Sequence, residues 1–237
     1  MSQDVYAMET QVDEFAFSEK SVRRGFIRKV YAVLSTQLVI TFSIVAVFVL
    51  VPEVQTFAVE NMVVFWVAIG ITLAIVIALS CGGNLRRKTP HNYIALFLFT
   101  LCEGYLIGSA AATFEAKDVL TAVGATIVVT IGLTLFAFQT KWDFTLLNGM
   151  LYTTLLMLIF FGIMAAIMQS RVLYTLYACI GALLFCFYIV FDTQLMLGGN
   201  HKLTISPEEY IFAALNLYLD VVNLFMYLLL IFGGGRD

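Results

Sequence analysis

Charged residues are scarce in this chain, and that scarcity excludes a water-soluble fold. Only 12% of the 237 residues are Asp, Glu, Lys or Arg, whereas 61% are hydrophobic. Soluble domains carry roughly 25% charged residues and about half apolar ones, so a soluble chain of this composition would leave much apolar surface in water. We therefore expect an integral membrane protein.

Recognisable motifs of enzymes and metal sites are also missing. The sequence contains no Walker loop, no dinucleotide-binding fingerprint, no HExxH and no GxSxG. The cysteines lack zinc spacing and lie within or at the ends of apolar runs, which favours reduced thiols that act as small apolar side chains. They are Cys81, Cys102, Cys179 and Cys186. We expect neither an enzyme, nor a tightly bound cofactor, nor a nucleic-acid partner.

Apolar runs dominate what is present, and each is about long enough to cross the roughly 30 Å hydrocarbon core of a bilayer. The runs cover residues 30–51, 62–81, 93–114, 119–138, 144–168, 172–197 and 210–232. The polar breaks between them are too short for a separate soluble domain. The sequence predicts an all-α bundle of seven transmembrane helices in one domain, residues 30–237, after an acidic and then basic cytosolic tail, residues 1–29.

The first 20 residues are polar and acidic, unlike a secretory signal, which begins with positive charge followed by a short apolar core. We expect the first span to act as an uncleaved anchor. Small residues in the third span, among them Gly104 and Gly108, predict close helix packing there.

The basic residues predict the orientation of the chain, because cytoplasmic loops carry an excess of Lys and Arg. With the N-terminus in the cytosol, ten of the thirteen basic residues lie inside, and Lys117, Arg171 and Arg236 lie outside. The ten are Lys20, Arg23, Arg24, Arg28, Lys29, Arg86, Arg87, Lys88, Lys141 and Lys202. The side of the C-terminus stays open, since the last span carries Asp220 at its centre and could be re-entrant.

Three carboxylates interrupt the apolar spans: Glu103, Asp192 and Asp220. An ionised carboxylate at bilayer depth costs at least about 2.5 kcal/mol, so each needs a partner, a proton or water. The last span also carries a polar stripe at spacings that place its members on one helical face. The stripe consists of Asn216, Asp220, Asn223 and Tyr227. It must face protein or water, so the last helix should be enclosed by the others.

Asp192 and Asp220 both lie toward the side of the loop that joins the last two spans, so they could meet. Two facing carboxylates in a low dielectric tend to share one proton, and when both are ionised they favour separation or capture of a hard cation such as calcium. Further oxygen ligands for calcium could come from Asn216 or Asn223. The alternative is plain hydrogen bonding between helices, worth about 0.6 kcal/mol per contact. We favour an ion or proton site; Glu103 fits either role.

The Arg86-Arg87-Lys88 cluster follows the second span. It is typical of a topology signal. A sharper hypothesis is that Arg86 reaches inward and neutralises the acidic pair, which would stabilise a closed state.

Four segments of the sequence together resemble the transmembrane Bax inhibitor motif family, also called the Lifeguard family, with the strongest similarity to its Golgi anti-apoptotic branch. The segments are residues 21–31, 84–90, 191–194 and 217–225. The resemblance implies six helices around a central seventh, and a passive, pH-sensitive calcium leak from internal stores. It also implies that Asp192 and Asp220 are the pH sensor and that Arg86 interacts with them. The chain ends in Gly-Gly-Gly-Arg-Asp instead of the short basic tail of vertebrate members of that branch.

The leading hypothesis is a calcium-permeable leak channel, or a calcium/proton exchanger, of Golgi or endoplasmic reticulum membranes. Its partners would be the lipid bilayer, calcium, protons and other membrane proteins of apoptosis or calcium handling. The alternative is a non-conducting adaptor that regulates cell-death signalling. A third class, an intramembrane aspartic protease, lacks the glycine-containing motif expected beside Asp192 and Asp220.

Overall fold

A computed structural model describes the backbone of residues 2–82, 86–198 and 202–234, and the side chains of these ranges from residue 21 onward. The acidic side chains of the first 20 residues, Lys20, Arg236 and the end of the C-terminal tail lie outside the described side chains. The part of the resemblance that falls on residues 84 and 85 does so too.

Helices account for nearly all of the described chain, as expected for segments that must satisfy every backbone hydrogen bond inside a bilayer. The long helices are α1 (Ser2–Leu50), α3 (Met62–Cys81), α5 (His91–Ala111), α6 (Ala116–Gln139), α7 (Asn148–Met168), α8 (Arg171–Leu197) and α9 (Tyr210–Gly233). The short ones are α2 (Pro52–Glu60) and the 3-10 turns η1 (Phe144–Leu147) and η2 (Pro207–Glu209). No strand occurs in the ranges described above.

The predicted seven spans are confirmed. Seven helices are long and apolar enough to cross a membrane, with mean hydropathies of 1.7 to 2.8. The predicted start of the first span at residue 30 lies inside α1, which continues through the basic stretch without a break. Helix α2 was not predicted: Pro52 occupies its first turn together with Glu53, and both residues favour a helix start.

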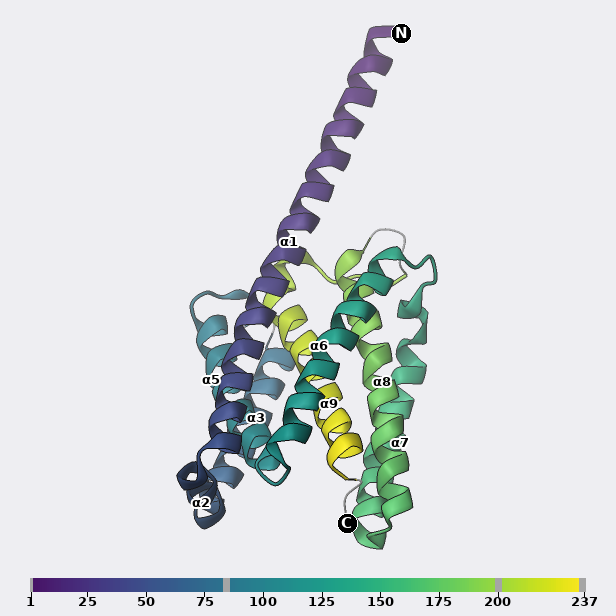
Figure 1. The fold of residues 1–237 in the computed structure, drawn as a ribbon. Helices are drawn as coiled ribbons and strands as arrows, with labels where there is room; N and C mark the ends of the chain where they lie inside the picture. Colours follow the sequence, from purple (N-terminus) through teal and green to yellow (C-terminus); the bar gives the residue numbers. More distant parts are fainter. Residues whose placement is uncertain (1, 83–85, 199–201, 235–237) are drawn as a thin grey trace.

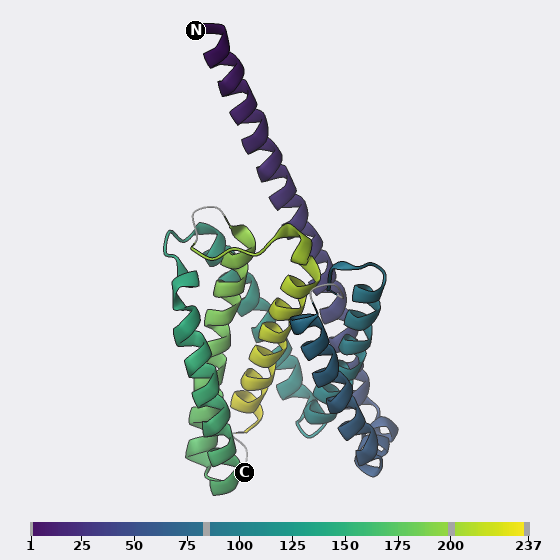
Figure 2. The same ribbon diagram turned by 180° about the vertical axis from the view of Figure 1, so that it is seen from behind.

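The long helices run up and down through one bundle (Figures 1 and 2). The start of the span in α1 and the connectors before α5, α7 and α9 lie at one end, which we call the basic end. Basic side chains of the described chain gather there: Arg23, Arg24, Arg28, Lys29, Arg86, Arg87, Lys88, Lys141 and Lys202. Helix α9 begins at this end and finishes at the opposite one, so the last span crosses the bundle and is not re-entrant.

Helix α9 is the most enclosed span, as the sequence predicted. Half of its most apolar window is buried, compared with 17% to 39% in the other spans. It packs directly on α1, α5, α6 and α8, while α3 lies on α5 and α7 lies on α8. The last helix therefore forms the centre, and α3 and α7 complete the ring from outside.

The close packing predicted for the third span is confirmed at its contact with α1. A Cβ atom at Gly104 would lie 2.8 Å from Ile44 Cδ1, and one at Gly108 would lie 2.9 Å from the Phe48 ring. The need for glycine is stronger at Gly108, where the Phe48 ring and its Cβ atom would both be crowded, than at Gly104, where only the end of the Ile44 side chain would have to move.

Candidate functional site

Asp192 and Asp220 are held by the two helices that pack most extensively on each other, α8 and α9. Asp192 lies five residues before the end of α8, and Asp220 lies ten residues after the start of α9. At a rise of 1.5 Å per residue, both carboxyl groups are about 8–15 Å from the basic end. They therefore lie within the half of the membrane that faces that end.

The two aspartates meet. Their carboxyl groups are close enough to interact electrostatically, and only 8% of Asp192 and 5% of Asp220 is exposed. Asp220 Oδ2 is buried and lacks a hydrogen-bond partner among the described residues. A hydrogen bond between two carboxyl groups needs a proton on one of them. The geometry therefore fits a pair that shares one proton.

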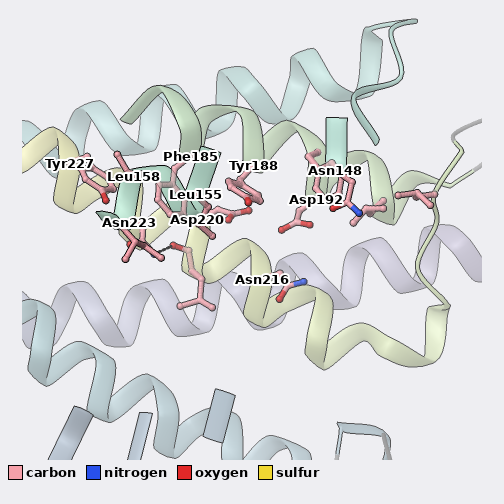
Figure 3. A pocket seen from close by; sticks show the side chains of 15 residues that line it. Asn148, Leu155, Leu158, Phe185, Tyr188, Asp192, Asn216, Asp220, Asn223 and Tyr227 are labelled. Atoms are coloured by element: carbon pink, nitrogen blue, oxygen red, sulfur yellow. Dashed lines mark hydrogen bonds between the residues drawn. The ribbon is translucent and has the colours of Figure 1, made fainter. Parts of the chain in front are cut away.

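A cavity of about 610 Å³ lies beside this acid pair, between α7, α8 and α9. Figure 3 shows Asp192 and Asp220 directed into the same space next to Tyr188. The lining reaches from Leu203, in the exposed connector at the basic end, to Tyr227 deep in the bundle. A cavity of this volume can hold several water molecules or a hydrated cation.

The polar stripe of α9 lines this cavity. Asn216, Asp220, Asn223 and Tyr227 all contribute to its wall, so the enclosed polar face predicted from their spacing is observed. Asn223 donates from Nδ2 to the Leu219 carbonyl oxygen at 2.7 Å. Its amide oxygen is a carbonyl acceptor of the type that calcium accepts as a ligand.

An aromatic cluster bounds the cavity on the side away from the basic end. The hydroxyl groups of Tyr177 and Tyr227 lie 3.0 Å apart in a hydrogen bond, and the Tyr227 ring stacks on Phe185 at 5.7 Å. Gly181 makes this possible, since a Cβ atom there would overlap the Tyr227 ring. Tyr227 is the lining residue of α9 that lies farthest from the basic end.

The connectors at the basic end are joined to one another over the cavity. Gln194, which follows Asp192, points away from the acid pair: it accepts from Phe144 N at 2.7 Å and donates to the Trp142 carbonyl oxygen at 2.8 Å. Arg23 of α1 donates to the Ile205 carbonyl oxygen at 2.9 Å. The α6–α7 and α8–α9 connectors and α1 therefore hold one another in place.

Arg86 is not placed where the hypothesis of an inward-reaching arginine put it. Its Nε lies 2.5 Å from Glu209 Oε2, and its guanidinium packs over the Phe212 ring at 5.1 Å. Arg87 pairs with the other oxygen of the same carboxylate. The reason is electrostatic: Glu209 is only 4% exposed at the start of α9 and forms ion pairs with both arginines. We call Arg86, Arg87 and Glu209 the arginine clamp.

Glu103 lies apart from the acid pair, on α5 and outside the cavity. It is close enough to Tyr218 of α9 to interact with it electrostatically, and the Tyr218 hydroxyl is hydrogen-bonded to Thr41 Oγ1 at 2.8 Å. Tyr218 and Asp220 thus project from different faces of α9. The structure does not bring Glu103 to the predicted ion site.

The cavity offers a cation two carboxyl groups, those of Asp192 and Asp220, and three amide side chains, those of Asn148, Asn216 and Asn223. No cluster of three or more His, Cys, Asp or Glu that could hold a metal occurs in the described part of the chain. A calcium ion at Asp192 and Asp220 would therefore need amide oxygens of Asn148, Asn216 or Asn223, or water. This donor set fits a transient ion better than a tightly held one.

Sequence reasoning missed Glu209 and the Tyr177–Tyr227 contact. Glu209 stands in a polar break beside Glu208, and nothing in the spacing distinguishes the buried carboxylate from the exposed one. Tyr177 lies in α8 among many aromatic residues. Only its position across from Tyr227, which the sequence pattern does not reveal, identifies it.

Comparison with known proteins identifies the family of this chain. A family model described as "Inhibitor of apoptosis-promoting Bax1" matches residues 23–237. Protein lifeguard 3 of Homo sapiens is 38% identical over 221 residues, which cover 92% of this chain and 71% of the relative. Bax inhibitor 1 of Schizosaccharomyces pombe is 40% identical over 237 residues, covering 97% of this chain and 83% of the relative.

These matches confirm the resemblance drawn from the four segments. They extend from the basic stretch of α1 through α9, and so include both aspartates, the cavity and the arginine clamp. Together with the seven spans, they show that the chain belongs to the Bax inhibitor and lifeguard family of anti-apoptotic membrane proteins.

Proposed function

We propose that this protein is a pH-sensitive calcium leak pathway, or a calcium/proton exchanger, of intracellular membranes. Its activity lowers the calcium content of the store and suppresses apoptosis in that way. The observation that carries the proposal is the buried contact of Asp192 and Asp220 at the wall of a 610 Å³ cavity. Buried acids that face a cavity within a membrane span are typical of ion and proton pathways.

Proton uptake and cation binding compete at the acid pair. With one proton between them, the two carboxyl groups form a hydrogen bond and hold α8 against α9. When the proton leaves, two negative charges in a low dielectric repel each other and attract a cation. Deprotonation therefore opens the pathway and protonation closes it.

Contacts between elements lie near both ends of the cavity. The linked connectors lie at the basic end, and the Tyr177–Tyr227 contact lies at the other side. Conduction would require these contacts to move. Separation of α8 from α9 moves the aromatic cluster directly, since Tyr177 belongs to α8 and Tyr227 to α9.

Orientation and location are part of the proposal. The gathering of basic side chains at one end supports a cytosolic N-terminus, because positively charged loops stay in the cytoplasm. The acid pair then lies in the cytosolic half of the membrane. The similarity to lifeguard 3 and the resemblance to the Golgi branch support Golgi membranes, with the endoplasmic reticulum as the alternative store.

The proposal is tested with purified full-length protein in liposomes loaded with a calcium indicator. Calcium flux is measured over a series of pH values for the wild type and for a Asp192→Asn, Asp220→Asn double variant. We expect flux that rises with pH in the wild type and is independent of pH in the variant. Unchanged pH dependence in the variant would contradict the proposed role of Asp192 and Asp220.

A matched control separates the acid pair from general charge effects. Glu208→Gln removes one carboxylate from an exposed position outside the cavity, so its flux should keep the pH dependence of the wild type. Absence of flux from well-folded wild-type protein would instead favour the adaptor hypothesis, in which the protein acts through binding to other membrane proteins.

A further inference from the structure

A second cavity lies between α1 and α5, apart from the acid pair. It measures about 160 Å³. Its wall is formed by Val33, Thr36, Gln37, Ile40, Tyr93, Leu96, Phe97 and Thr100. None of these residues lines the larger cavity, so the two spaces have separate walls.

Gln37, in the wall of this second cavity, carries a hydrogen-bond acceptor that has no donor in the described chain. The side chain is 4% exposed, and its Oε1 atom is buried without a partner among the residues that the structure describes. A buried carbonyl oxygen without a donor is destabilising. A donor from a molecule that enters the cavity would remove this cost.

The protein's own donors around the cavity are already engaged. Gln37 Nε2 donates to Thr100 Oγ1 at 3.1 Å, Thr100 Oγ1 donates to the Leu96 carbonyl oxygen at 2.8 Å, and Thr36 Oγ1 donates to the Ala32 carbonyl oxygen at 2.9 Å. Tyr93 is hydrogen-bonded to Tyr210. A ligand that fits this cavity therefore supplies one hydrogen-bond donor and needs no donor from the protein.

The cavity is accessible from the lipid phase. Thr36 is exposed, as are Tyr93 at 39% and Phe97 at 54%, and all three lie in membrane spans. Lys29 lies over the Tyr210 ring at 3.4 Å and marks the basic end of the bundle. Gln37 is two helical turns farther along α1, about 12 Å below it, within the leaflet at that end.

We propose that this second cavity binds a membrane sterol, with the sterol hydroxyl donating to Gln37 Oε1. A sterol carries a single hydroxyl on an otherwise apolar, rigid ring system, which matches one free acceptor in a wall of branched and aromatic side chains. Phosphatidylcholine has no donor and cannot satisfy Gln37. A diacylglycerol adds ester carbonyl groups for which the wall has no free donor.

The size of the cavity limits how the sterol lies. At about 160 Å³ it is smaller than pockets that enclose a whole drug-sized ligand, so it holds the hydroxyl-bearing end alone. The remaining rings lie along the exposed surfaces of α1 and α5. The site is separate from Asp192 and Asp220, so the proposal does not depend on calcium flux.

The test uses purified full-length protein in phosphatidylcholine nanodiscs with a photoactivatable cholesterol analogue, followed by mapping of labelled peptides. We expect labelling on α1 and α5 that is displaced by cholesterol. Cholesterol methyl ether, which lacks the donor, and diacylglycerol should not displace it. Loss of one hydrogen bond of about 1 kcal/mol predicts about fivefold weaker labelling in Gln37→Leu.

Two further variants keep the test decisive. Val33→Phe fills the cavity and leaves Gln37 in place, so it should also abolish displaceable labelling. Gln139→Leu changes the same side chain at an exposed position at the end of α6 and should label like the wild type. The proposal is overturned if the methyl ether or diacylglycerol competes as well as cholesterol. It is equally overturned if labelling spreads over all lipid-facing helices, which would leave water as the occupant.

Discussion

Asp220 of α9 and Asp192 of α8 are in side-chain contact, and Asp220 Oδ2 is buried with no donor from the described chain. A proton on the pair supplies the missing donor and removes one of two adjacent negative charges. The protonated pair thus stabilises the packing of α8 on α9, and the doubly ionised pair weakens it. The protonated state, which stabilises the α8–α9 packing, is therefore also the closed state of the proposed pathway.

Asp220→Asn should mimic the protonated pair permanently. The asparagine amide can donate to the ionised Asp192, and a hydrogen bond to a charged group contributes about 1.5–3 kcal/mol. We expect the variant to unfold at a higher temperature than the wild type in alkaline buffer, with a smaller difference in mildly acidic buffer. Thermal unfolding in detergent over a pH series measures this. A variant that is less stable than the wild type at every pH would contradict the shared proton.

The arginine clamp predicts a local effect at the basic end. Glu209→Gln leaves Arg86 and Arg87 without their carboxylate, and Arg87 is half exposed, so screening keeps the cost to about 1 kcal/mol. We expect faster amide hydrogen exchange in residues 202–212, with little change in the far halves of the helices.

Glu208→Gln is the matched control for the clamp, since Glu208 is the exposed neighbour of the buried Glu209. Its exchange pattern should equal that of the wild type. Equal exchange in both variants would mean that the clamp does not hold the start of α9.

The number of spans, the central last helix and the meeting of the two aspartates could all be predicted from the sequence. Lipid imposes one strong rule, that apolar segments cross as helices and polar faces turn inward, and the stripe from Asn216 to Tyr227 follows that rule. The common loop after α8 and before α9 then brings Asp192 and Asp220 to the same side of the bundle.

The partner of Arg86 could not be predicted in the same way. An arginine at the end of a span can reach any acid within several ångströms. Whether Arg86 pairs with Asp192 or with Glu209 depends on the course of its side chain, which the spacing of residues in the sequence does not indicate. The Gln37 cavity was missed for a similar reason. In the sequence, a glutamine within a span indicates only a hydrogen bond between helices. The structure adds that Gln37 Oε1 has no donor in the part of the chain that it describes.

The α1–α5 contact predicts opposite effects for two glycine substitutions. Gly108→Ala places a Cβ atom 2.9 Å from the Phe48 ring, whereas a Cβ atom at Gly124 of α6 meets nothing within 4 Å. Crowding costs typically about 1–3 kcal/mol, and alanine in an open helix position gains up to about 1 kcal/mol over glycine. Thermal unfolding should therefore rank Gly124→Ala at or above the wild type and Gly108→Ala below it; the reverse order would contradict the close approach of α5 to α1.

The Tyr177–Tyr227 contact predicts how the far side of the cavity is closed. Tyr227 is 9% exposed and its hydroxyl bonds to that of Tyr177 across the α8–α9 contact, so removal of either hydroxyl weakens the same closure. With a hydrogen bond worth about 1 kcal/mol, Tyr227→Phe and Tyr177→Phe should each raise calcium flux in liposomes about fivefold at a fixed pH. The double variant should gain no more than either single variant, because both remove one interaction. Tyr152→Phe, at a position that is 61% exposed on α7, serves as the control and should leave flux unchanged. Additive gains from the two substitutions, or equal flux in all variants, would show that this contact is not the closure.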